Sequence, residues 1–385
     1  MEHGMAEEYL STAEVARRLG IKPETVYAYV SRGLLSSVRP RGQRGSLFAA
    51  DEVERLALRD PRRQRSTVDD PTRIRTEVTQ FTDGELRYRG HSAVRLATEA
   101  TPESVAHLLW TGSLEPREPF PRDPELVGLA RSLIDALPET ARLTDRLRVA
   151  VVGLGAADPL RFDLSPASVV RTVRTLLGVL TDSLGPSSAD SGWGRRLWPA
   201  LSAHPEPPGL LDAALVLLAD HELAVSTLSA RVAASARANP YAVVSAALGA
   251  LDGPYHGAAS SVAYRFWVDA LADPVGALSE RLRTGEPLPG FGHRLYRTQD
   301  PRAELLLGLL RGRPEADTMM TAVDKVITLA QGQFPNVDLA LAVMMHVYDM
   351  RPDAGEALFA LARTPGWTAH ALEEYQHPPL RLRPT

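Results

Sequence analysis

The chain has 385 residues, of which 44% are hydrophobic and 23% are charged, and a formal net charge of −4 at pH 7. This composition fits a soluble globular protein of two or three domains with a substantial buried core. The absence of cysteine excludes disulfides, thiolate metal sites and a cysteine nucleophile. The acidic residues 1–8 do not have the pattern of a signal peptide, and charged side chains interrupt the apolar stretch 210–235, which excludes a membrane span there. We therefore expect a cytoplasmic protein.

The N-terminal part of the chain is basic, whereas the remainder is acidic. Residues 9–65 hold 12 Lys and Arg against 6 Asp and Glu, and residues 66–385 hold 31 against 38. A basic segment joined to an acidic body indicates two modules that have different partners.

Residues 9–58 have the pattern of a small winged helix-turn-helix domain. A capping box at Ser11 to Glu14 predicts the first helix. The expected order is a helix at 11–19, a second helix at 22–30, a basic wing at 39–46, a strand at 47–48 and a helix at 51–58. This order resembles the winged helix-turn-helix of the MerR and excisionase families, whose second helix enters the major groove of DNA.

The resemblance implies that residues 1–65 form a DNA-binding-like domain. The second helix would face DNA, and the basic wing would contact phosphates. The residues expected in these roles are Lys22, Thr25, Tyr27 and Tyr29 in the helix, and Arg41 and Arg44 in the wing. The alternative is a structural or protein-binding appendage whose basic loop is merely solvated.

The rest of the chain is predicted to be mainly helical. Residues 59–75 are charged and contain two prolines, as is typical of a linker. A hairpin with its turn at Asp83-Gly84 is expected next. The apolar periodicity then predicts helices at 101–109, 124–136, 139–155, 165–184, 209–235, 240–251, 257–272, 275–283, 301–311, 315–332, 337–350 and 353–373.

The stretch 289–303 combines a glycine-rich turn, one histidine and several arginines. Asp300 and Pro301 would cap and begin a helix, which places Arg302 at a helix N-terminus. A histidine and guanidinium groups beside a helix N-terminus form a site for an anion, most simply a di- or tricarboxylate. The alternative is a solvated basic loop ahead of an ordinary helix.

Three further segments place polar groups in apolar or glycine-rich settings. They are 219–223 with His221, 252–258 with His256, and 334–338 with Asn336 and Asp338, followed by the late arginines Arg363 and Arg383. Each has an ordinary structural explanation when it is taken alone, such as a buried histidine or an acid favoured by a helix N-terminus. Their combination favours a functional site.

In family order, these segments resemble the citrate synthase family over about residues 75–385. The resemblance rests on Leu86-Arg87-Tyr88-Arg89-Gly90, Asp220-His221-Glu222-Leu223, Gly253-Pro254-Tyr255-His256-Gly257, Gly290-Phe291-Gly292-His293-Arg294-Leu295-Tyr296, Asp300-Pro301-Arg302-Ala303, Pro335-Asn336-Val337-Asp338 and Arg363-Thr364-Pro365-Gly366-Trp367. It implies a two-domain helical fold. A large domain would comprise 75–256 and 346–385, and a small domain 257–345, with substrate in the cleft between them.

The same resemblance implies the condensation of acetyl-CoA with oxaloacetate to give citrate and CoA. Asp338 matches the family's base, which removes a proton from the acetyl methyl group. His256 matches the donor that stabilises the enol or enolate, and His293 would polarise the ketone of oxaloacetate. No cofactor would be bound permanently, because acetyl-CoA is a substrate.

Five further residues receive binding roles from the resemblance. His221, Arg302 and Arg363 would hold the carboxylates of oxaloacetate, and Arg297 would lie toward the CoA phosphates. Arg383 would complete the site of the neighbouring subunit, which implies an obligate homodimer. Asp338 raises one question: a helix N-terminus lowers the pKa of a carboxyl group, whereas burial raises it.

The chain departs from the family pattern on the acetyl-CoA side. Ala224 stands where family members usually carry Asn, the usual His-Gly-Gly-Ala-Asn becomes His256-Gly257-Ala258-Ala259-Ser260, and Gln331 and Gln333 replace a lysine-rich approach. Two alternatives therefore stay open. One is a DNA-binding regulator whose enzyme-like body is a catalytically weakened sensor, and the other is a 2-methylcitrate synthase that uses propionyl-CoA.

Overall fold

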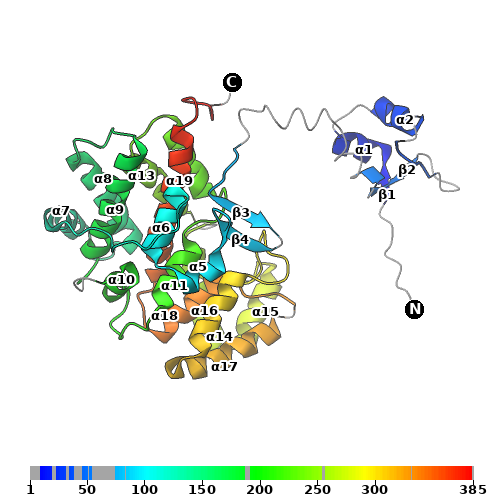
Figure 1. The fold of residues 1–385 in the computed structure, drawn as a ribbon. Coiled ribbons are helices and arrows are strands. Elements are labelled where there is room, and N and C mark those ends of the chain that lie inside the picture. Colours follow the sequence, from blue (N-terminus) through cyan, green and yellow to red (C-terminus); the bar gives the residue numbers. More distant parts are fainter. Residues whose placement is uncertain are drawn as a thin grey trace. The chain divides into compact units, whose positions relative to one another are not determined.

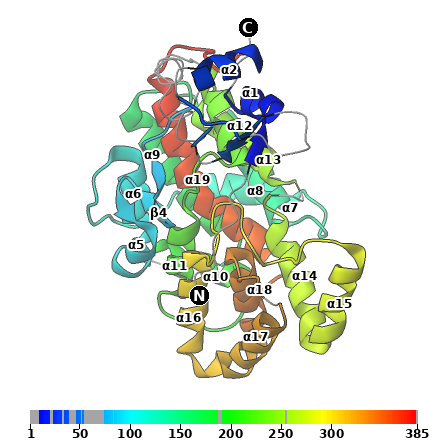
Figure 2. The same cartoon turned by 90° about the vertical axis from the view of Figure 1, so that its right-hand side faces the viewer.

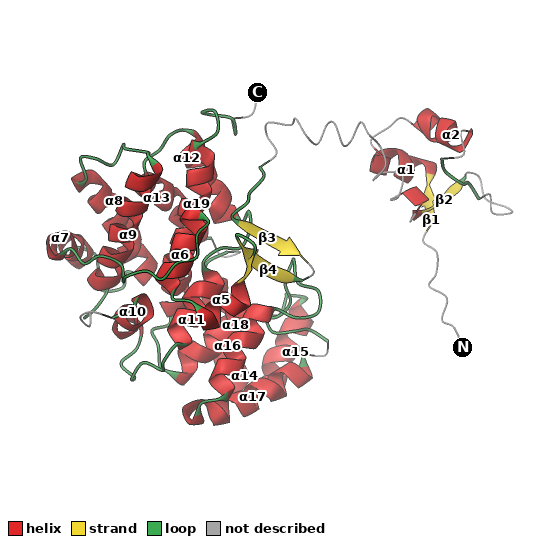
Figure 3. Cartoon of the chain, viewed as in Figure 1, coloured by secondary structure: helices red, strands yellow, loops and turns green. Residues whose placement is uncertain are grey.

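The computed structural model describes residues 9–19, 23–31, 34–38, 46–50, 52–53, 74–82, 84–186, 191–253, 256–330 and 332–383. The chain separates into two compact units, Met1–Ile74 and Arg75–Thr385. Helices dominate the described part of the chain (Figure 3), so the mainly helical fold expected from the sequence is confirmed.

In the residues that the structure describes, the first unit has the helices α1 and α2 and a two-stranded antiparallel sheet. The capping box is confirmed, since the Ser11 amide donates to the Glu14 carboxylate over 2.8 Å and the Glu14 amide donates to Ser11 Oγ over 3.4 Å. Leu10, Val15, Val26 and Phe48 are among the buried side chains that form its small core. The elements are β1 Tyr9–Ser11, α1 Thr12–Leu19, α2 Pro23–Ser31 and β2 Leu47–Ala49.

The residues expected to contact DNA are only partly covered by the structure. On α2, Tyr27 is 49% exposed, and Thr25 and Tyr29 are half-buried. Lys22, Arg41 and Arg44 lie outside the described residues, as do most of the expected linker and Gln331.

The second unit begins with a short antiparallel meander (Figure 1). Its strands are β3 Thr79–Thr82, β4 Glu85–Tyr88 and β5 His91–Ser92. Gly84, in the turn between β3 and β4, has a φ of 78°, a conformation that glycine adopts without steric cost. The hydroxyl of Tyr88, on β4, reaches into the helical body and matters for the site described below.

Helices form the rest of this unit. Their bounds are α5 Ala93–Glu99, α6 Pro102–Thr111, α7 Pro124–Asp135, α8 Leu143–Ala157, α9 Pro166–Ser183, α10 Trp193–Leu201, α11 Leu210–Leu218, α12 Val225–Ser235, α13 Pro240–Leu251, α14 Ala259–Ala272, α15 Pro274–Thr284, α16 Pro301–Arg311, a 3-10 turn η1 Pro314–Ala316, α17 Asp317–Leu329, α18 Val337–Val347 and α19 Ala354–Tyr375. Among the described residues, no helix is long and apolar enough to cross a membrane.

The long helix α19 runs through the middle of this unit (Figure 2). Every residue from Ala354 to Leu372 is buried, and α6, α8, α9, α11, α12 and α13 pack around it. Small residues allow these close approaches. A Cβ on Gly366 would strike the carbonyl oxygen of Ala219, so α19 can touch the segment after α11 only because position 366 is glycine.

The helices α14 to α18 pack mainly on one another at one end of the unit (Figure 2). They span residues 259–347, and α18 also contacts α19. This grouping agrees with a small domain at 257–345, and the division of 75–385 into a large and a small domain stays a prediction.

Helix α5 is absent from the sequence-based expectation, and so is α10. The sequence at α10 contains Gly192, Gly194 and Pro199, which disfavour a helix prediction. Tertiary contacts stabilise this helix instead. Arg196 is 2% exposed, forms an ion pair with Asp182 of α9 and donates through Nη1 to a backbone carbonyl of residue 120 over 2.6 Å. A buried guanidinium that satisfies both a carboxylate and carbonyls fixes the position of its helix.

The expectation of one continuous helix over 209–235 is wrong. The structure has α11 and α12, separated by residues 219–224, and Glu222 adopts a left-handed φ of 52°. Side chains from elsewhere take the carbonyl groups that would continue α11. Arg363 Nε donates to the Leu218 carbonyl over 2.7 Å, and the Tyr88 hydroxyl lies 3.1 Å from the Asp220 carbonyl oxygen. Local periodicity does not contain these distant partners, which explains the error.

Candidate active site

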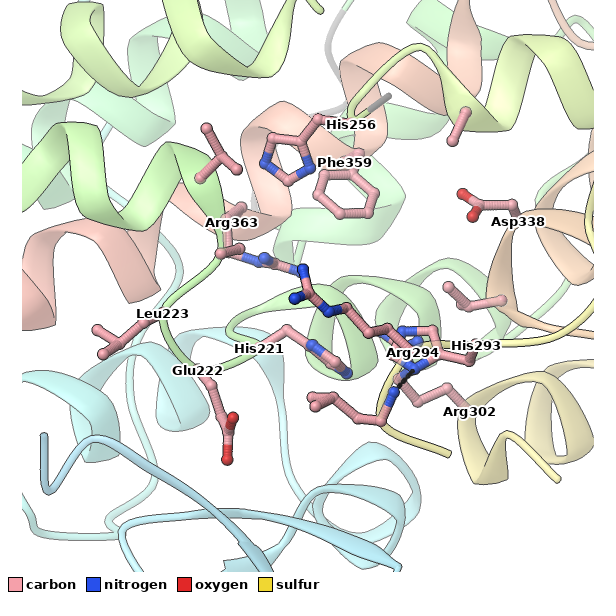
Figure 4. A pocket seen from close by; sticks show the side chains of 15 residues that line it. His221, Glu222, Leu223, His256, His293, Arg294, Arg302, Asp338, Phe359 and Arg363 are labelled. Carbon is pink, nitrogen blue, oxygen red and sulfur yellow. Dashed lines mark hydrogen bonds between the residues drawn. The ribbon is translucent and has the colours of Figure 1, made fainter. Parts of the chain in front are cut away.

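A cleft of about 620 Å³ lies between α11–α12, α14, α16, α18 and α19. Figure 4 shows five of the predicted residues, His221, His256, His293, Asp338 and Arg363, around the same opening. The side chains that line it are His221, Glu222, Leu223, Ala224, Val225, His256, Ala259, His293, Arg294, Leu295, Arg302, Val337, Asp338, Phe359 and Arg363. Residues separated by up to 142 positions in the sequence therefore meet here.

The break between α11 and α12 places His221 on the wall of the cleft. Its ring meets the ring of His293 edge to face, with the centroids 5.1 Å apart. Its Nε2 is buried and has no hydrogen-bond partner among the described residues. Burial, together with the nearby Arg302 and Arg363, holds the pKa of His221 well below its usual range, so the imidazole is neutral.

Arg363 supplies a second unpartnered donor. It is 1% exposed, and its Nε is used by the Leu218 carbonyl, whereas the buried Nη2 has no partner among the described residues. Its guanidinium lies 4.6 Å from the ring centroid of Phe359. Because a buried polar group without a partner is costly, Arg363 Nη2, together with His221 Nε2 in the tautomer that carries its proton there, fits a bound anion.

Arg302 lies at the start of α16, as expected from the sequence, and is buried against Asp300. Its Nε and Nη2 donate to the two carboxylate oxygens over 3.0 and 2.8 Å. Asp300 also caps α16 and accepts from the Val337 amide over 3.0 Å, which ties α16 to the start of α18. The bidentate pair holds a guanidinium rigidly on the cleft wall.

The hydrogen bonds of His293 fix its tautomer. Nδ1 accepts from the amides of Leu295 over 3.0 Å and Tyr296 over 3.3 Å, and Figure 4 draws the first of these contacts. Because Nδ1 accepts, the proton of the neutral ring is on Nε2. Burial and the charge of Arg302 lower the pKa of His293 to about 4, so the neutral form is present at pH 7 and can donate from Nε2.

A serine that the sequence reasoning missed contacts His256. Ser226 Oγ lies 2.7 Å from His256 Nε2 and accepts from Trp367 Nε1 over 3.1 Å. Since the indole occupies Ser226 as an acceptor, the serine hydroxyl is free to donate to Nε2, which places the ring proton on Nδ1. Burial and Arg363 lower the pKa of His256 to about 4. The only sequence signal for Ser226 was its place five residues after His221.

Asp338 stands in the first turn of α18, where Asn336 is the cap. The Asn336 side chain accepts from the Asp338 amide over 3.0 Å and donates to the Gly292 carbonyl over 2.9 Å. Within the described part of the chain, the Asp338 carboxylate has no hydrogen-bond partner. Burial raises its pKa to about 6, although Arg302 and Arg363 act in the opposite direction. Burial therefore outweighs the attraction of the two arginines.

Two predicted residues do not reach this cleft in a single chain. Arg297 and Arg383 are exposed and are not among its lining residues, so their roles stay predictions. Arg294, Phe359 and Glu222 line it without having received a role from the sequence. Among the described residues, no cluster of three histidines or acidic residues could hold a metal ion.

Known families match both units of the chain. The model for the citrate synthase C-terminal domain matches residues 70–385, and a helix-turn-helix domain model matches residues 9–60. Citrate synthase of Haloferax volcanii is 30% identical over 328 residues, which cover 76% of this chain and 86% of that protein. 2-Methylcitrate synthase 2 of Corynebacterium glutamicum is 28% identical, with 78% of this chain and 87% of that protein covered.

Solved structures agree with these matches. Citrate synthase from Thermotoga maritima MSB8 superposes with a TM-score of 0.67 at 26% identity, covering 81% of this chain and 92% of that chain. The enzyme from Thermoplasma acidophilum, solved as a ternary complex with carboxymethyl coenzyme A and oxaloacetate, gives a TM-score of 0.68 at 24% identity and shares the fold, covering 83% and 94%. A family model that spans most of the chain, and a relative at 30% identity that the chain covers over most of its length, show that this chain belongs to the citrate synthase family.

Proposed function

We propose that unit 75–385 condenses acetyl-CoA with oxaloacetate and releases citrate and CoA. One observation carries the proposal: buried polar atoms on His221 and Arg363 without partners among the described residues lie in the same cleft as a carboxylate whose pKa is raised and two histidines whose pKa is lowered. Such a cleft can bind a dicarboxylate and exchange protons near neutral pH.

Oxaloacetate would be bound by its two carboxylates. Arg363 Nη2 is an available donor, His221 Nε2 would donate in the tautomer that carries its proton there, and Arg302 adds a positive charge that its pairing with Asp300 holds in place. His293 would then donate from Nε2 to the ketone oxygen. Binding both ends of the molecule orients the carbonyl face toward the acyl donor, which removes much of the entropic cost of the reaction.

Asp338 would remove a proton from the acetyl methyl group. The electron pair of the broken C–H bond is delocalised onto the thioester oxygen, which gives the enol or enolate. This oxygen accepts a hydrogen bond from His256 Nδ1. The enol carbon then attacks the ketone carbon of oxaloacetate, and His293 gives a proton to the alkoxide that forms. Hydrolysis of the thioester by water releases citrate and CoA. A neutral His256 suits this step, because it donates a hydrogen bond without costly desolvation of a charge.

The acyl-CoA would enter from the side of the small domain. Arg297 is exposed on the loop ahead of α16 and would contact the CoA phosphates, and no permanently bound cofactor is required. Closure of 257–345 on the large domain would exclude water while the enolate exists.

A second candidate is a 2-methylcitrate synthase that uses propionyl-CoA. The observation that favours it is the apolar part of the cleft lining, which Leu223, Ala224, Ala259, Val337 and Phe359 provide. Such a lining can accommodate one more methyl group, and a methylene in an apolar pocket is worth only about 1–3 kcal/mol of discrimination.

We also propose that the chain forms a homodimer in which Arg383 completes the neighbouring site. Arg383 is exposed outside the cleft of its own chain. Several large apolar side chains of α8, of the segment that follows α8 and of α12 are exposed, which favours burial against a second copy. They are Val152, Leu160, Phe162, Val225 and Val232, each between 54% and 68% exposed.

For unit 1–74 we propose DNA binding. The helix-turn-helix model match, the confirmed helices α1 and α2, and the exposed Tyr27 on α2 support it. The condensing activity and DNA binding would then be properties of two different units, and a regulator with an inactive sensor body is the alternative that the first prediction tests.

Replacing Asp338 with alanine should abolish turnover, because the variant removes the proposed base from the cleft. We expect thiol release from acetyl-CoA plus oxaloacetate to fall by about 10²–10⁴-fold. Asp317→Ala is a matched control, since Asp317 is also a first-turn acid but is exposed on α17. The measurement is repeated with propionyl-CoA to compare the two acyl donors. If the wild-type protein released no thiol from either donor, it would be a sensor and not an enzyme.

The activity should fall on the acid side of pH 6. The pKa of Asp338 is raised to about 6, and only its ionised form can accept the methyl proton, so activity is present above this pH and lost as pH falls through it. His256 and His293, with a pKa of about 4, stay neutral across this range. The profile of kcat/KM against pH should therefore report a single ionisation per site. Below the pKa, kcat/KM should drop about tenfold per pH unit. A profile that is flat between pH 5 and 7 would contradict the assignment of the base.

Mixing two inactive variants should restore activity if Arg383 acts across the dimer. In hybrids of Asp338→Ala and Arg383→Ala chains, one of the two sites has an intact Asp338 and the partner's Arg383. Random pairing in a two-fold dimer then returns about a quarter of wild-type activity. A mixture of Asp338→Ala with His293→Ala is the control that should stay inactive, because both residues serve the same site. No gain in the first mixture would show that Arg383 does not serve the neighbour.

The full-length protein should bind random duplex DNA in a salt-dependent manner. Fluorescence anisotropy between 50 and 200 mM salt should give an affinity whose salt slope falls by about two for Arg41→Ala/Arg44→Ala, one for each arginine that no longer neutralises a phosphate. Arg265→Ala/Arg283→Ala removes two exposed arginines from the other unit and should leave the slope unchanged. Binding that does not respond to salt, or that survives removal of residues 1–74, would refute the proposal.

A further inference from the structure

A buried polar network lies behind His221, on the side away from the cleft. Asp220, the residue before His221, is fully buried in the break between α11 and α12. Its carboxylate oxygen Oδ2 accepts a short hydrogen bond from Thr79 Oγ1 on β3 and lies 3.2 Å from His370 Nε2 on α19. Two elements far apart in the sequence therefore hold the residue next to a proposed substrate ligand.

The contacts of His370 determine its role toward Asp220. Its Nδ1 lies 3.1 Å from Arg231 Nη1 and 3.3 Å from Thr76 Oγ1. A guanidinium can only donate, so Nδ1 accepts, and the ring proton is on Nε2. His370 therefore donates to Asp220, and Arg231 fixes the ring in this orientation.

Arg231 is in turn fixed by two acids of α19. It is fully buried on α12, and it donates through Nη1 to Glu373 over 2.8 Å and through Nε to Glu374 over 3.2 Å. Glu374 is also fully buried and binds Arg381, in the C-terminal segment, over 2.6 and 2.8 Å. Every contact in this network is an ion pair or a hydrogen bond, and none of the network's side chains lines the cleft.

The network also holds the first residues of unit 75–385. The Glu77 amide donates to Glu373 over 2.8 Å, and Thr76 contacts His370. The start of the unit, its C-terminal segment and the break that carries His221 are thus joined at one place. Burying ions costs free energy, and apolar side chains could pack α12 on α19 without that cost. We therefore attribute these buried charges to the orientation of the segment 219–224 rather than to stability alone.

We propose that His370 and Thr79 are positioning residues, which fix Asp220 and thereby hold the His221 imidazole in the orientation that binds a carboxylate of the substrate. The inference rests on the proposed function, because it assigns His221 to that carboxylate. Neither residue touches the substrate. The segment 219–224 has no helical hydrogen-bond ladder to hold it, and it depends on side-chain contacts to Asp220 and on the carbonyl contacts of Tyr88 and Arg363.

Thr79→Val is the first test, since it keeps the volume and removes only the donor to Asp220. We expect oxaloacetate, titrated by calorimetry without acyl-CoA, to bind about tenfold more weakly. The KM for oxaloacetate should rise similarly, and the KM for acetyl-CoA should stay within about twofold. Thr144→Val is the matched control, because Thr144 is buried and its hydroxyl has no hydrogen-bond partner among the described residues.

The second test compares two variants of His370. Gln keeps an N–H donor near the position of Nε2, whereas Leu removes it at similar volume. His370→Leu should weaken oxaloacetate binding by at least as much as Thr79→Val, and His370→Gln should restore most of the loss. All assays are made well below the Tm of the least stable variant, so that unfolding does not contribute.

The outcomes separate the two proposals. If the wild-type protein turns over and both Thr79→Val and His370→Leu bind oxaloacetate with the wild-type Kd, the positioning role is wrong and the proposed function stands. Equal losses toward oxaloacetate and acetyl-CoA would also overturn it, since they indicate a purely structural role. If the wild-type protein binds oxaloacetate but releases no thiol, the enzyme proposal fails and the Kd values still decide the positioning role. A wild-type protein that binds no oxaloacetate would overturn both.

Discussion

The structure of the site depends on one interrupted helix. Residues 210–235 are apolar enough to form a single buried helix, yet α11 ends at Leu218 and α12 begins at Val225. A continued helix would satisfy its backbone carbonyls internally. Here side chains from β4 and α19, chiefly Tyr88 and Arg363, make those hydrogen bonds instead. Because Arg363 caps α11 with Nε and presents Nη2 to the cleft, the same guanidinium ends the helix and contributes to the anion site.

Burial then sets the protonation of the site in two opposite directions. It lowers the pKa of His256 and His293 and raises that of Asp338, because a low-dielectric surrounding disfavours the charged form of each group. Two neutral imidazoles and a carboxylate that ionises near pH 6 follow from this single cause. The arginines add to the effect on the histidines and oppose it on Asp338, so the shift of the carboxylate is the net of burial and attraction.

The sequence predicted which residues meet but not how they are held. His221, His256, His293, Arg302, Asp338 and Arg363 all line one cleft, as the family motifs indicated. The interruption at 219–224, the helices α5 and α10 and the contact of Ser226 with His256 were missed. The interruption, α10 and the Ser226 contact depend on partners 14 to 145 residues away in the sequence, and neither hydrophobic periodicity nor capping patterns contain such partners. The roles of Arg297 and Arg383 could not be decided in one chain for the same reason.

The acyl side of the cleft shows how a departure from the family pattern can be accommodated. Ala224, where relatives usually carry Asn, is the N-cap of α12 and makes no side-chain cap, so an amide is missing both from the helix end and from the wall of the cleft. Ser226 contacts His256 and is itself held by Trp367, so the ring keeps a hydrogen-bond partner without the amide. We expect the substitution to act on the choice of acyl group and on water in the cleft. The proposed ketone-binding side, with His293 and the Asp300–Arg302 pair, keeps its contacts.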